Sequence, residues 1–198
     1  MWDEKYATEE YVYGTEPTGF LRARAEYLIP GARALAVADG EGRNSVYLAQ
    51  QGLNVTAMDG STVALDKARR LAAARDVEVG YHHGDITCWD WRPDAYDLVV
   101  AVFIQFLDPA ARAKVFEGMK RTLAPGGVLL LHGYRPEQLD YATGGPPNAD
   151  FMYTEQLLTS SFADLEILRL KGYDTEIHEG TGHAGMSALI DLVARKPA

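Results

Sequence analysis

A chain of 198 residues with 47% hydrophobic composition can bury a full core, and its length fits one domain better than two. Acidic residues (28) outnumber basic ones (19), the formal net charge is -9, and no Lys or Arg cluster stands out, so the basic footprint of a nucleic-acid-binding protein is missing. The acidity itself names no partner, because a surplus of Asp and Glu mostly serves solubility.

Cysteine usage and hydropathy favour a cytoplasmic protein. Cys88 is the only cysteine, which excludes an intramolecular disulfide and fits a reducing compartment. Residues 1–5 show no basic stretch followed by an apolar one, and the longest apolar runs, such as 98–104, are too short to span a bilayer. We therefore expect no membrane insertion. We also expect the protein to be a monomer or a weak homodimer.

Short apolar runs alternate with helix-like segments, the pattern that produces βαβ units and a parallel sheet covered on both faces. Strands are predicted at residues 34–38, 54–58, 77–82, 96–104 and 128–131. Helices are predicted at residues 44–51, after the cap Ser61, after the cap and first-turn proline Asp108-Pro109, and near residues 154–162.

The last third of the chain follows a different pattern. Residues 144–147, Gly-Gly-Pro-Pro, predict a stiff irregular loop. Residues 165–177 and 187–194 then flank a glycine-rich loop at 179–185, which predicts two antiparallel neighbouring strands at one edge of the sheet.

Two features near the first two strands indicate an adenosine-type ligand. Gly40 and Gly42 form a turn between the first strand and the first helix, where the backbone approaches a ligand closely and free amide groups point at it. Asp59 ends the second strand, where an acidic side chain in such folds accepts hydrogen bonds from the ribose hydroxyls. The adjacent Asn44 and Gly60 belong to the same predicted site.

A third feature, Gly84-Asp85-Ile86, directly follows the third strand. Here Asp85 can accept a hydrogen bond from an adenine amino group while Ile86 packs on the ring. This arrangement resembles the adenine site of class I S-adenosylmethionine (SAM) dependent methyltransferases. The resemblance extends over nearly the whole chain, through the segments 34–42, 55–59, 84–86, 96–100 and 123–127 and the terminal strand pair.

Within that superfamily, the segments 2–6, 11–17 and 40–44 resemble small bacterial proteins related to tellurite-resistance methyltransferases. The resemblance implies SAM as cofactor and a small-molecule methyl acceptor. It also implies an α/β, Rossmann-like, seven-stranded, mostly parallel sheet with an antiparallel terminal strand and helices on both faces. We expect one methyltransferase domain over residues 1–198, with residues 1–30 as an N-terminal cover segment.

The first loop departs from the superfamily pattern, which usually places an acid two residues before the first glycine of a longer glycine run. Those positions hold Ala36 and Ala38 here, and alanine is tolerated only where φ is negative. The methionine end of SAM thus lacks a usual partner. Asp39 either replaces that acid or merely accepts hydrogen bonds from loop amides.

Aromatic residues before the first strand are candidates to close over the cofactor, and Tyr13 and Gly14 are the predicted contacts. Alternatively, Trp2, Tyr6 and Tyr11 pack an N-terminal helix on the sheet. The end of the fourth strand supplies two further candidates. Phe103 is a candidate to contact the cofactor, and Gln105 is a candidate catalytic residue.

The acceptor side is predicted where the loops at 144–147 and 180–185 meet above the methyl group. His132 and Arg135 reach this edge from the fifth strand, and His183 comes from the second loop. His132 or His183 would serve as a base for a hydroxyl or amine acceptor, whereas an ionised acceptor needs none. Arg135 is a candidate to hold an anionic acceptor. In the alternative interpretation, both loops are ordinary surface connections, and the side chains of Arg135 and His183 point to solvent.

The five histidines show no compact ligand spacing, so no metal site is expected. Two alternatives remain: a SAM-binding sensor without catalysis, and an NAD-dependent oxidoreductase. The latter needs a third small residue in its glycine fingerprint, a position that Ser45 fills imperfectly. The sequence leaves the acceptor's identity and the use of a base open.

Overall fold

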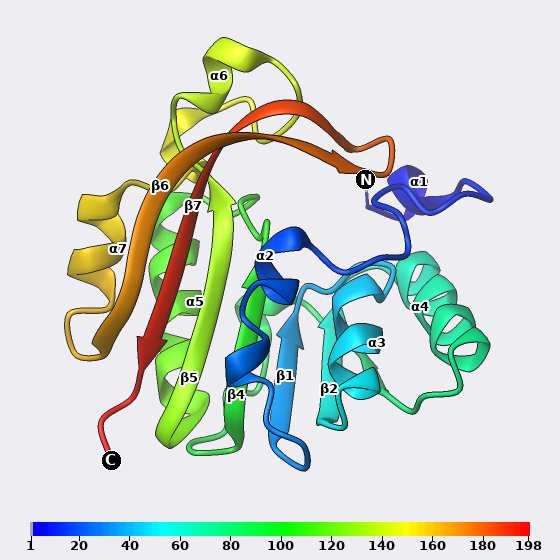
Figure 1. The fold of residues 1–198 in the computed structure, drawn as a ribbon, viewed down its shortest axis with the longest axis horizontal. Helices are drawn as coiled ribbons and strands as arrows, with labels where there is room; N and C mark the ends of the chain where they lie inside the picture. The colour runs from blue at the N-terminus through cyan, green and yellow to red at the C-terminus, as the bar shows by residue number, and fades with distance from the viewer. Residues whose placement is uncertain (1) are drawn as a thin grey trace.

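The structure is a computed structural model that describes residues 2–198; residue 1, the first of the expected cover segment, lies outside the described residues. The described residues form one mixed sheet in the order β3-β2-β1-β4-β5-β7-β6 (Figure 1). Its strands are β1 (Arg33–Val37), β2 (Asn54–Asp59), β3 (Gly80–His83), β4 (Tyr96–Val102), β5 (Leu123–Tyr134), β6 (Glu166–Glu179) and β7 (His183–Arg195).

Strand direction confirms the predicted fold class. The five strands from β1 to β5 pair in parallel, whereas β7 lies antiparallel between β5 and β6. The parallel strands end together at the upper edge in Figure 1, where the turn between β6 and β7 also lies. The carboxyl ends of the strands, the usual ligand-binding edge of such sheets, therefore meet the two terminal strands there.

Helices cover both faces of the sheet, as predicted. In Figure 1, α2, α3 and α4 lie in front of the sheet and α5 and α7 behind it. Each face has its own apolar cluster because successive side chains of a strand alternate between faces: Ala34 and Ala36 pack with the front helices, Leu35 and Val37 with the rear ones. The helices are α1 (Trp2–Tyr6), α2 (Gly19–Arg22), α3 (Arg43–Gln50), α4 (Thr62–Ala74), α5 (Pro109–Thr122), α6 (Gln138–Tyr141) and α7 (Glu155–Ser161), with short 3-10 turns at Ala25–Tyr27, Ile86–Cys88 and Ala149–Phe151. Within residues 2–198, no helix combines the length and apolarity that a bilayer crossing needs.

The predicted helix starts are confirmed, and one strand boundary was wrong. Ser61 and Asp108 cap α4 and α5 by accepting from the third amide of each helix. The third strand begins at Gly80 rather than at residue 77. Val77 instead packs with Leu71 in a small apolar cluster, so its side chain is partly buried without joining the sheet.

The first loop is more strained than expected. Ala38 has a positive φ of 47°, where a negative φ was expected for alanine. The end of β2 holds this conformation: the Ala38 amide donates to the Met58 Sδ at 3.3 Å, and the Asp39 amide donates to the Met58 carbonyl at 3.1 Å. The loop is thus bent toward β2 and presents its next residues to the upper edge.

Gly42 begins α3 at a φ of 92°, and a Cβ added there would lie 2.7 Å from the Cβ of Ala68 on α4. Gly126 has a similar φ of 76°, but a Cβ there meets nothing within 4 Å. Gly42→Ala should therefore destabilise the fold by roughly 1–3 kcal/mol more than Gly126→Ala, since only the first adds a clash to the backbone strain. Urea unfolding of both variants measures the difference. Equal losses would show that helix packing does not require Gly42.

Candidate functional site

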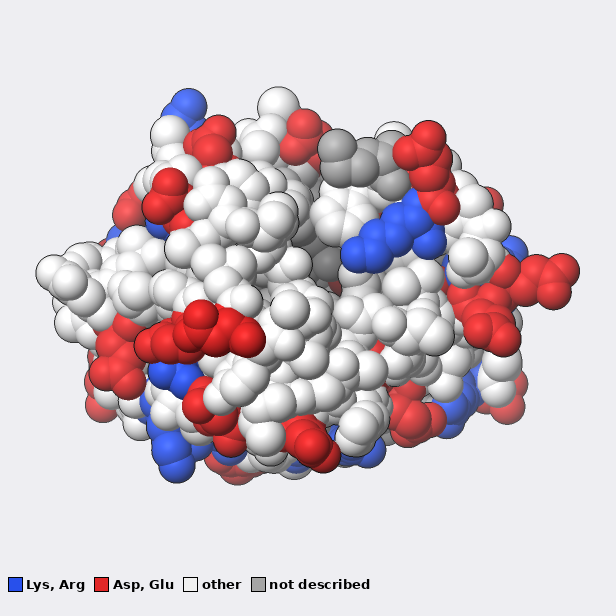
Figure 2. All heavy atoms as spheres, turned by 90° about the horizontal axis from the view of Figure 1, so that it is seen from above, with Lys and Arg blue, Asp and Glu red and all other residues white. Residues whose placement is uncertain are grey.

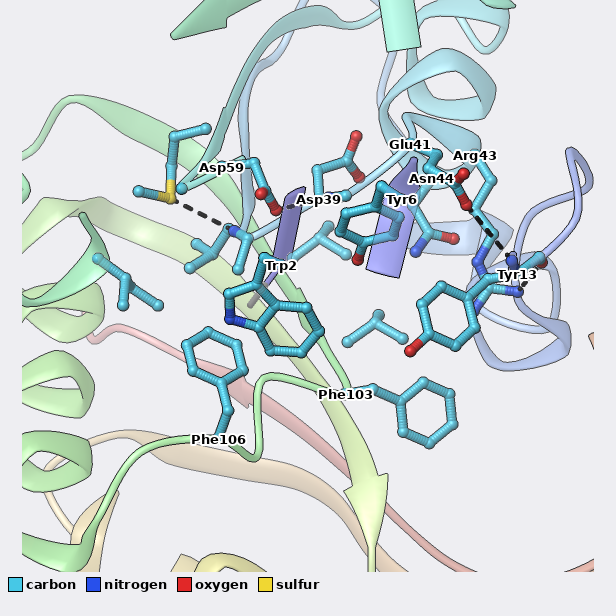
Figure 3. A pocket seen from close by; sticks show the side chains of 18 of the residues that line it. Trp2, Tyr6, Tyr13, Asp39, Glu41, Arg43, Asn44, Asp59, Phe103 and Phe106 are labelled. Atoms are coloured by element: carbon cyan, nitrogen blue, oxygen red, sulfur yellow. Dashed lines mark hydrogen bonds between the residues drawn. The ribbon is translucent and has the colours of Figure 1, made fainter. Parts of the chain in front are cut away.

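A pocket of about 560 Å³ opens at the carboxyl ends of β1, β2 and β4. Its volume lies in the range of small-molecule and cofactor sites. Figure 3 shows its two sides: Asp39, Glu41 and Asp59 lie on one side, and Phe103 and Phe106 on the other, with Trp2 between them. From above, the molecule shows acidic side chains around its rim and few basic ones (Figure 2).

Most of the residues predicted from the sequence line this pocket: Tyr13, Gly14, Asp39, Gly40, Asn44, Asp59, Gly60, Asp85, Ile86, Phe103 and His183. They come from the N-terminal segment, the first three strand ends, the end of β4 and the start of β7. Residues distant in the sequence therefore meet at one edge because the parallel strands end there.

Asp59 is fixed by two backbone amides. Its Oδ2 accepts from the Gly40 amide at 2.8 Å, and its Oδ1 accepts from the Ser61 amide at 2.8 Å. Each carboxylate oxygen has a second lone pair, so both can still accept from a ligand hydroxyl. Burial raises the pKa of Asp59, and the amide hydrogen bonds oppose that shift.

Asp39 has one partner and one free oxygen. Its Oδ1 accepts from the Ser45 amide at 3.2 Å, whereas its Oδ2 is buried without a hydrogen-bond partner among residues 2–198. Burial raises the pKa of Asp39 to about 7. An unpaired buried carboxylate is costly, so a donor on a ligand would be well placed here.

Asp85 lies at the outer end of the pocket and is exposed. Its Oδ1 accepts from the amide and the hydroxyl of Thr87, both at 2.8 Å, which lowers its pKa. Ile86 beside it is buried. A charged acceptor thus adjoins an apolar surface, the combination that a purine ring with an amino group needs.

A buried ion pair attaches the N-terminal segment to this pocket. The Lys67 Nζ of α4 lies 2.6 Å from the Glu41 Oε1, and both side chains are 2% exposed. The same ammonium donates to the Glu10 carbonyl at 2.6 Å, and the Tyr11 hydroxyl donates to the Lys67 carbonyl at 3.0 Å. Residues 10 and 11 are therefore anchored to α4.

A second ion pair joins the same segment to the terminal strands. The Arg43 Nη1 donates to the Tyr13 carbonyl at 3.1 Å and to the Glu179 Oε2 at 2.9 Å. The Val12 carbonyl accepts from the amides of residues 181 and 182. A Cβ at Gly182 would clash with the Tyr13 ring, so glycine permits this close approach.

The loops at 144–147 and 180–185 contact each other, since a Cβ at Gly144 would lie 3.2 Å from the Gly182 carbonyl oxygen. His183 follows the second loop and is buried, with its ring centroid 4.4 Å from that of Tyr13 and 4.3 Å from that of Phe103. Its Nδ1 lies 3.8 Å from the Glu179 Oε2. Burial lowers the pKa of His183, which favours the neutral imidazole at pH 7.

Two of the predicted residues serve the fold outside the pocket lining. Gly42 lies against α4, as described above. Gln105 is buried and bridges the end of β5: its amide group donates to the Tyr134 carbonyl at 2.8 Å and accepts from the Tyr134 amide at 2.6 Å. These two hydrogen bonds hold its side chain against β5, and the residue does not line the pocket.

His132 and Arg135 also lie outside the pocket lining, contrary to the expectation that β5 delivers them to the acceptor. The His132 Nδ1 pairs with the buried Asp191 at 2.9 Å, and Phe20 stacks on its ring. Arg135 pairs with Asp174 and donates to the Leu189 carbonyl at 3.1 Å. Residues of the two terminal strands thus hold both side chains.

The sequence analysis missed part of the lining. The additional residues are Trp2, Tyr6, Val37, Ala38, Glu41, Arg43, Met58, His83, Thr87, Val100, Val102, Phe106 and Leu107. The pattern did show aromatic residues near the N-terminus, but the packing of Trp2 against Phe106, with ring centroids 5.3 Å apart, depends on tertiary structure. Among the described residues, no group of His, Cys, Asp and Glu has metal-binding geometry.

Comparisons with known proteins agree with this geometry. Residues 34–127 match the family model of a methyltransferase domain. An uncharacterized methyltransferase of Synechocystis is 31% identical over 125 residues, which cover 62% of this chain and 56% of that protein. The chain thus spans little more than half the length of this curated relative.

Solved structures share the fold. The structure of TehB from Haemophilus influenzae has a TM-score of 0.75 at 22% identity, covering 98% of this chain and 65% of that one. The N-methyltransferase NodS from Bradyrhizobium japonicum, solved with S-adenosyl-l-homocysteine (SAH), has a TM-score of 0.72 at 16% identity, covering 100% of this chain and 97% of that one.

Lys67→Met should destabilise the protein by about 3–5 kcal/mol, because it leaves the buried Glu41 carboxylate without its cation. Adding Glu41→Gln should recover much of this loss, since no unpaired charge remains. Urea unfolding of the two single variants and the double variant measures the coupling. Strictly additive losses would contradict a strong interaction between these side chains.

Proposed function

We propose that the chain is a class I SAM-dependent methyltransferase that transfers the SAM methyl group to a small-molecule nucleophile by in-line displacement, a proposal supported by the match of residues 34–127 to a methyltransferase domain. The supporting observation is Asp59, a carboxylate held by two backbone amides at the end of β2 with lone pairs free for a ribose. It lies beside the glycine turn, within the matched methyltransferase domain.

The proposed cofactor position follows the pocket from Asp85 to Asp39. Adenine would pack on Ile86 with its amino group near Asp85, and the ribose hydroxyls would donate to Asp59. The ammonium group of SAM would donate to the unpartnered Oδ2 of Asp39. Asp39 would thereby replace the acid that is absent at Ala36.

The chain's contribution to catalysis would be positioning and exclusion of water. Methyl transfer needs the nucleophile, the methyl group and the sulfur nearly in line, and a closed site holds that arrangement. The anchored N-terminal segment and the loop before His183 provide such a closure around Tyr13.

The remaining expectations stay part of this proposal. One domain over residues 1–198 is supported by a single sheet whose strands run from β1 to β7. A cytoplasmic location rests on the free thiol of Cys88. A monomer or weak homodimer remains a prediction. Turnover of an acceptor would distinguish the enzyme from a SAM-binding sensor.

Calorimetry should show binding of SAM and SAH but not of NAD. Asp59→Ala should weaken SAM binding by about 2–3 kcal/mol, because two hydrogen bonds from ribose to a charged group are lost. Asp66→Ala is the matched control, since Asp66 is exposed on α4 and forms a surface ion pair with Arg69. NAD binding comparable to SAM, or unchanged SAM affinity in a folded Asp59→Ala protein, would contradict the assignment.

SAM affinity should rise with pH through the pKa of Asp39. Below about 7 the free protein holds Asp39 protonated. Pairing with the SAM ammonium requires the carboxylate, so binding there must release a proton. The association constant should increase on the order of tenfold between about pH 5.5 and about pH 7.

Asp39→Asn should bind SAM more weakly at about pH 7 and should lose most of this pH dependence, because asparagine does not titrate. Isothermal calorimetry in two buffers of different ionisation enthalpy measures both the affinity and the proton release. An unchanged pH dependence in the asparagine variant would remove Asp39 from the cofactor site.

A further inference from the structure

Among residues 2–198, no Lys or Arg side chain without an ion-pair partner lines the pocket. Arg43 is the only Lys or Arg among its described lining residues, and its side chain is 8% exposed. Its guanidinium is committed to Glu179 and to the Tyr13 carbonyl. Lys5 lies nearby, but its ammonium packs on the Trp2 and Tyr13 rings and does not line the pocket.

The acceptor side of the pocket is instead aromatic. Phe103 directly follows β4 with a φ of 56°, and its ring centroid lies 4.3 Å from His183 and 4.7 Å from Tyr134. Tyr13 covers His183 from the other side at 4.4 Å. A surface of this kind favours a neutral, largely apolar molecule over an oxyanion, because no unpaired Lys or Arg side chain of the described lining would offset the cost of desolvating the anion.

His183 is the titratable group within this aromatic cluster. Its Nδ1 is buried without a hydrogen-bond partner among residues 2–198 and lies 3.8 Å from the Glu179 carboxylate. Glu179 is itself held by Arg43 and accepts from the Gly19 amide at 3.3 Å. A fixed carboxylate on one side of an imidazole stabilises the imidazolium that forms when the other nitrogen takes a proton.

We propose that the methyl acceptor is an electrically neutral thiol, phenol or heteroaromatic amine, and that His183 removes its proton. This proposal rests on the proposed function of the pocket. As the acceptor atom bonds to the methyl carbon, the carbon–sulfur bond of SAM breaks and its electron pair stays on sulfur, giving neutral SAH. The acceptor proton passes to the Nε2 of His183 and then to solvent.

Charges on several elements act on His183. Glu179 on β6 favours its protonated form, whereas Arg43 on α3 and Lys5 on α1 oppose it. Burial opposes protonation most strongly and lowers the pKa of His183 below its ordinary value. Tyr13 and Tyr134 pack on its ring. The resting imidazole is therefore neutral near pH 7, the form that can accept a proton.

The acceptor charge is tested with wild-type protein and SAM by measuring SAH formation. The neutral probes are 2-mercaptoethanol, 4-methylphenol and imidazole-type heteroaromatic amines, and the anionic probes are selenite and tellurite. We expect turnover of a neutral probe and none of the oxyanions. Preferred turnover of an oxyanion, or failure of every neutral probe in a protein that binds SAM, would overturn the proposal. Absence of SAM binding would instead overturn the proposed function.

The base is tested with His183→Gln, with His178→Gln as the matched control because His178 on the adjacent β6 is exposed. For a neutral acceptor, kcat of His183→Gln should fall roughly 10²–10⁴-fold with SAM affinity nearly unchanged. The deficit should shrink for 4-nitrothiophenol, which is already ionised at neutral pH. An equal deficit for both acceptors would assign His183 a structural role only.

The pH dependence of kcat in the wild-type protein tests the role of His183 as the base without relying on a variant that must fold. With a neutral acceptor, kcat should rise with pH as His183 loses its proton, with an apparent pKa below the usual histidine value. With 4-nitrothiophenol this dependence should be absent. A pH profile that is the same for both acceptors would contradict the role of His183 as the base.

Discussion

The buried ion pair between Lys67 and Glu41 is the constraint on which the site depends. Glu41 lies between the two glycines of the first turn, and Lys67 lies on α4, so the pair fixes the loop against the helix. The ammonium also binds the Glu10 carbonyl, which ties the N-terminal segment to the same point. Because a buried charge is costly without its partner, loop, helix and cover segment hold their positions together.

This arrangement divides the pocket into a polar side and an aromatic side. Asp39 and Asp59 lie on one side of the pocket and Phe103 on the other (Figure 3). The rings of Phe103 and Tyr13 pack on His183, which we propose to be the acceptor side, whereas the two carboxylates would face the cofactor. SAM carries a positive sulfonium and SAH does not, so carboxylates near the site favour the substrate form of the cofactor over its product. The carboxylate side would thereby hold the cationic cofactor, and the aromatic side would exclude water from the acceptor.

The fold and the pocket residues at the strand ends were largely predictable from the sequence because they depend on local patterns. Strand ends place Asp59 and Asp85 at one edge, and Ser61 caps a helix by local geometry. The acceptor side was less predictable. Arg135 follows a strand that ends at the correct edge, but Asp174 of β6 pairs with it, and no local pattern reveals that partner.

The central claim is that this pocket holds SAM with its adenine at Ile86 and its amino-acid end at Asp39. A crystal structure of the protein with SAH tests it most directly. We expect ribose hydroxyls within hydrogen-bonding distance of Asp59, the SAH ammonium at the Oδ2 of Asp39 and the sulfur facing Phe103 and His183. SAH bound in the reversed orientation, or outside the pocket, would contradict it.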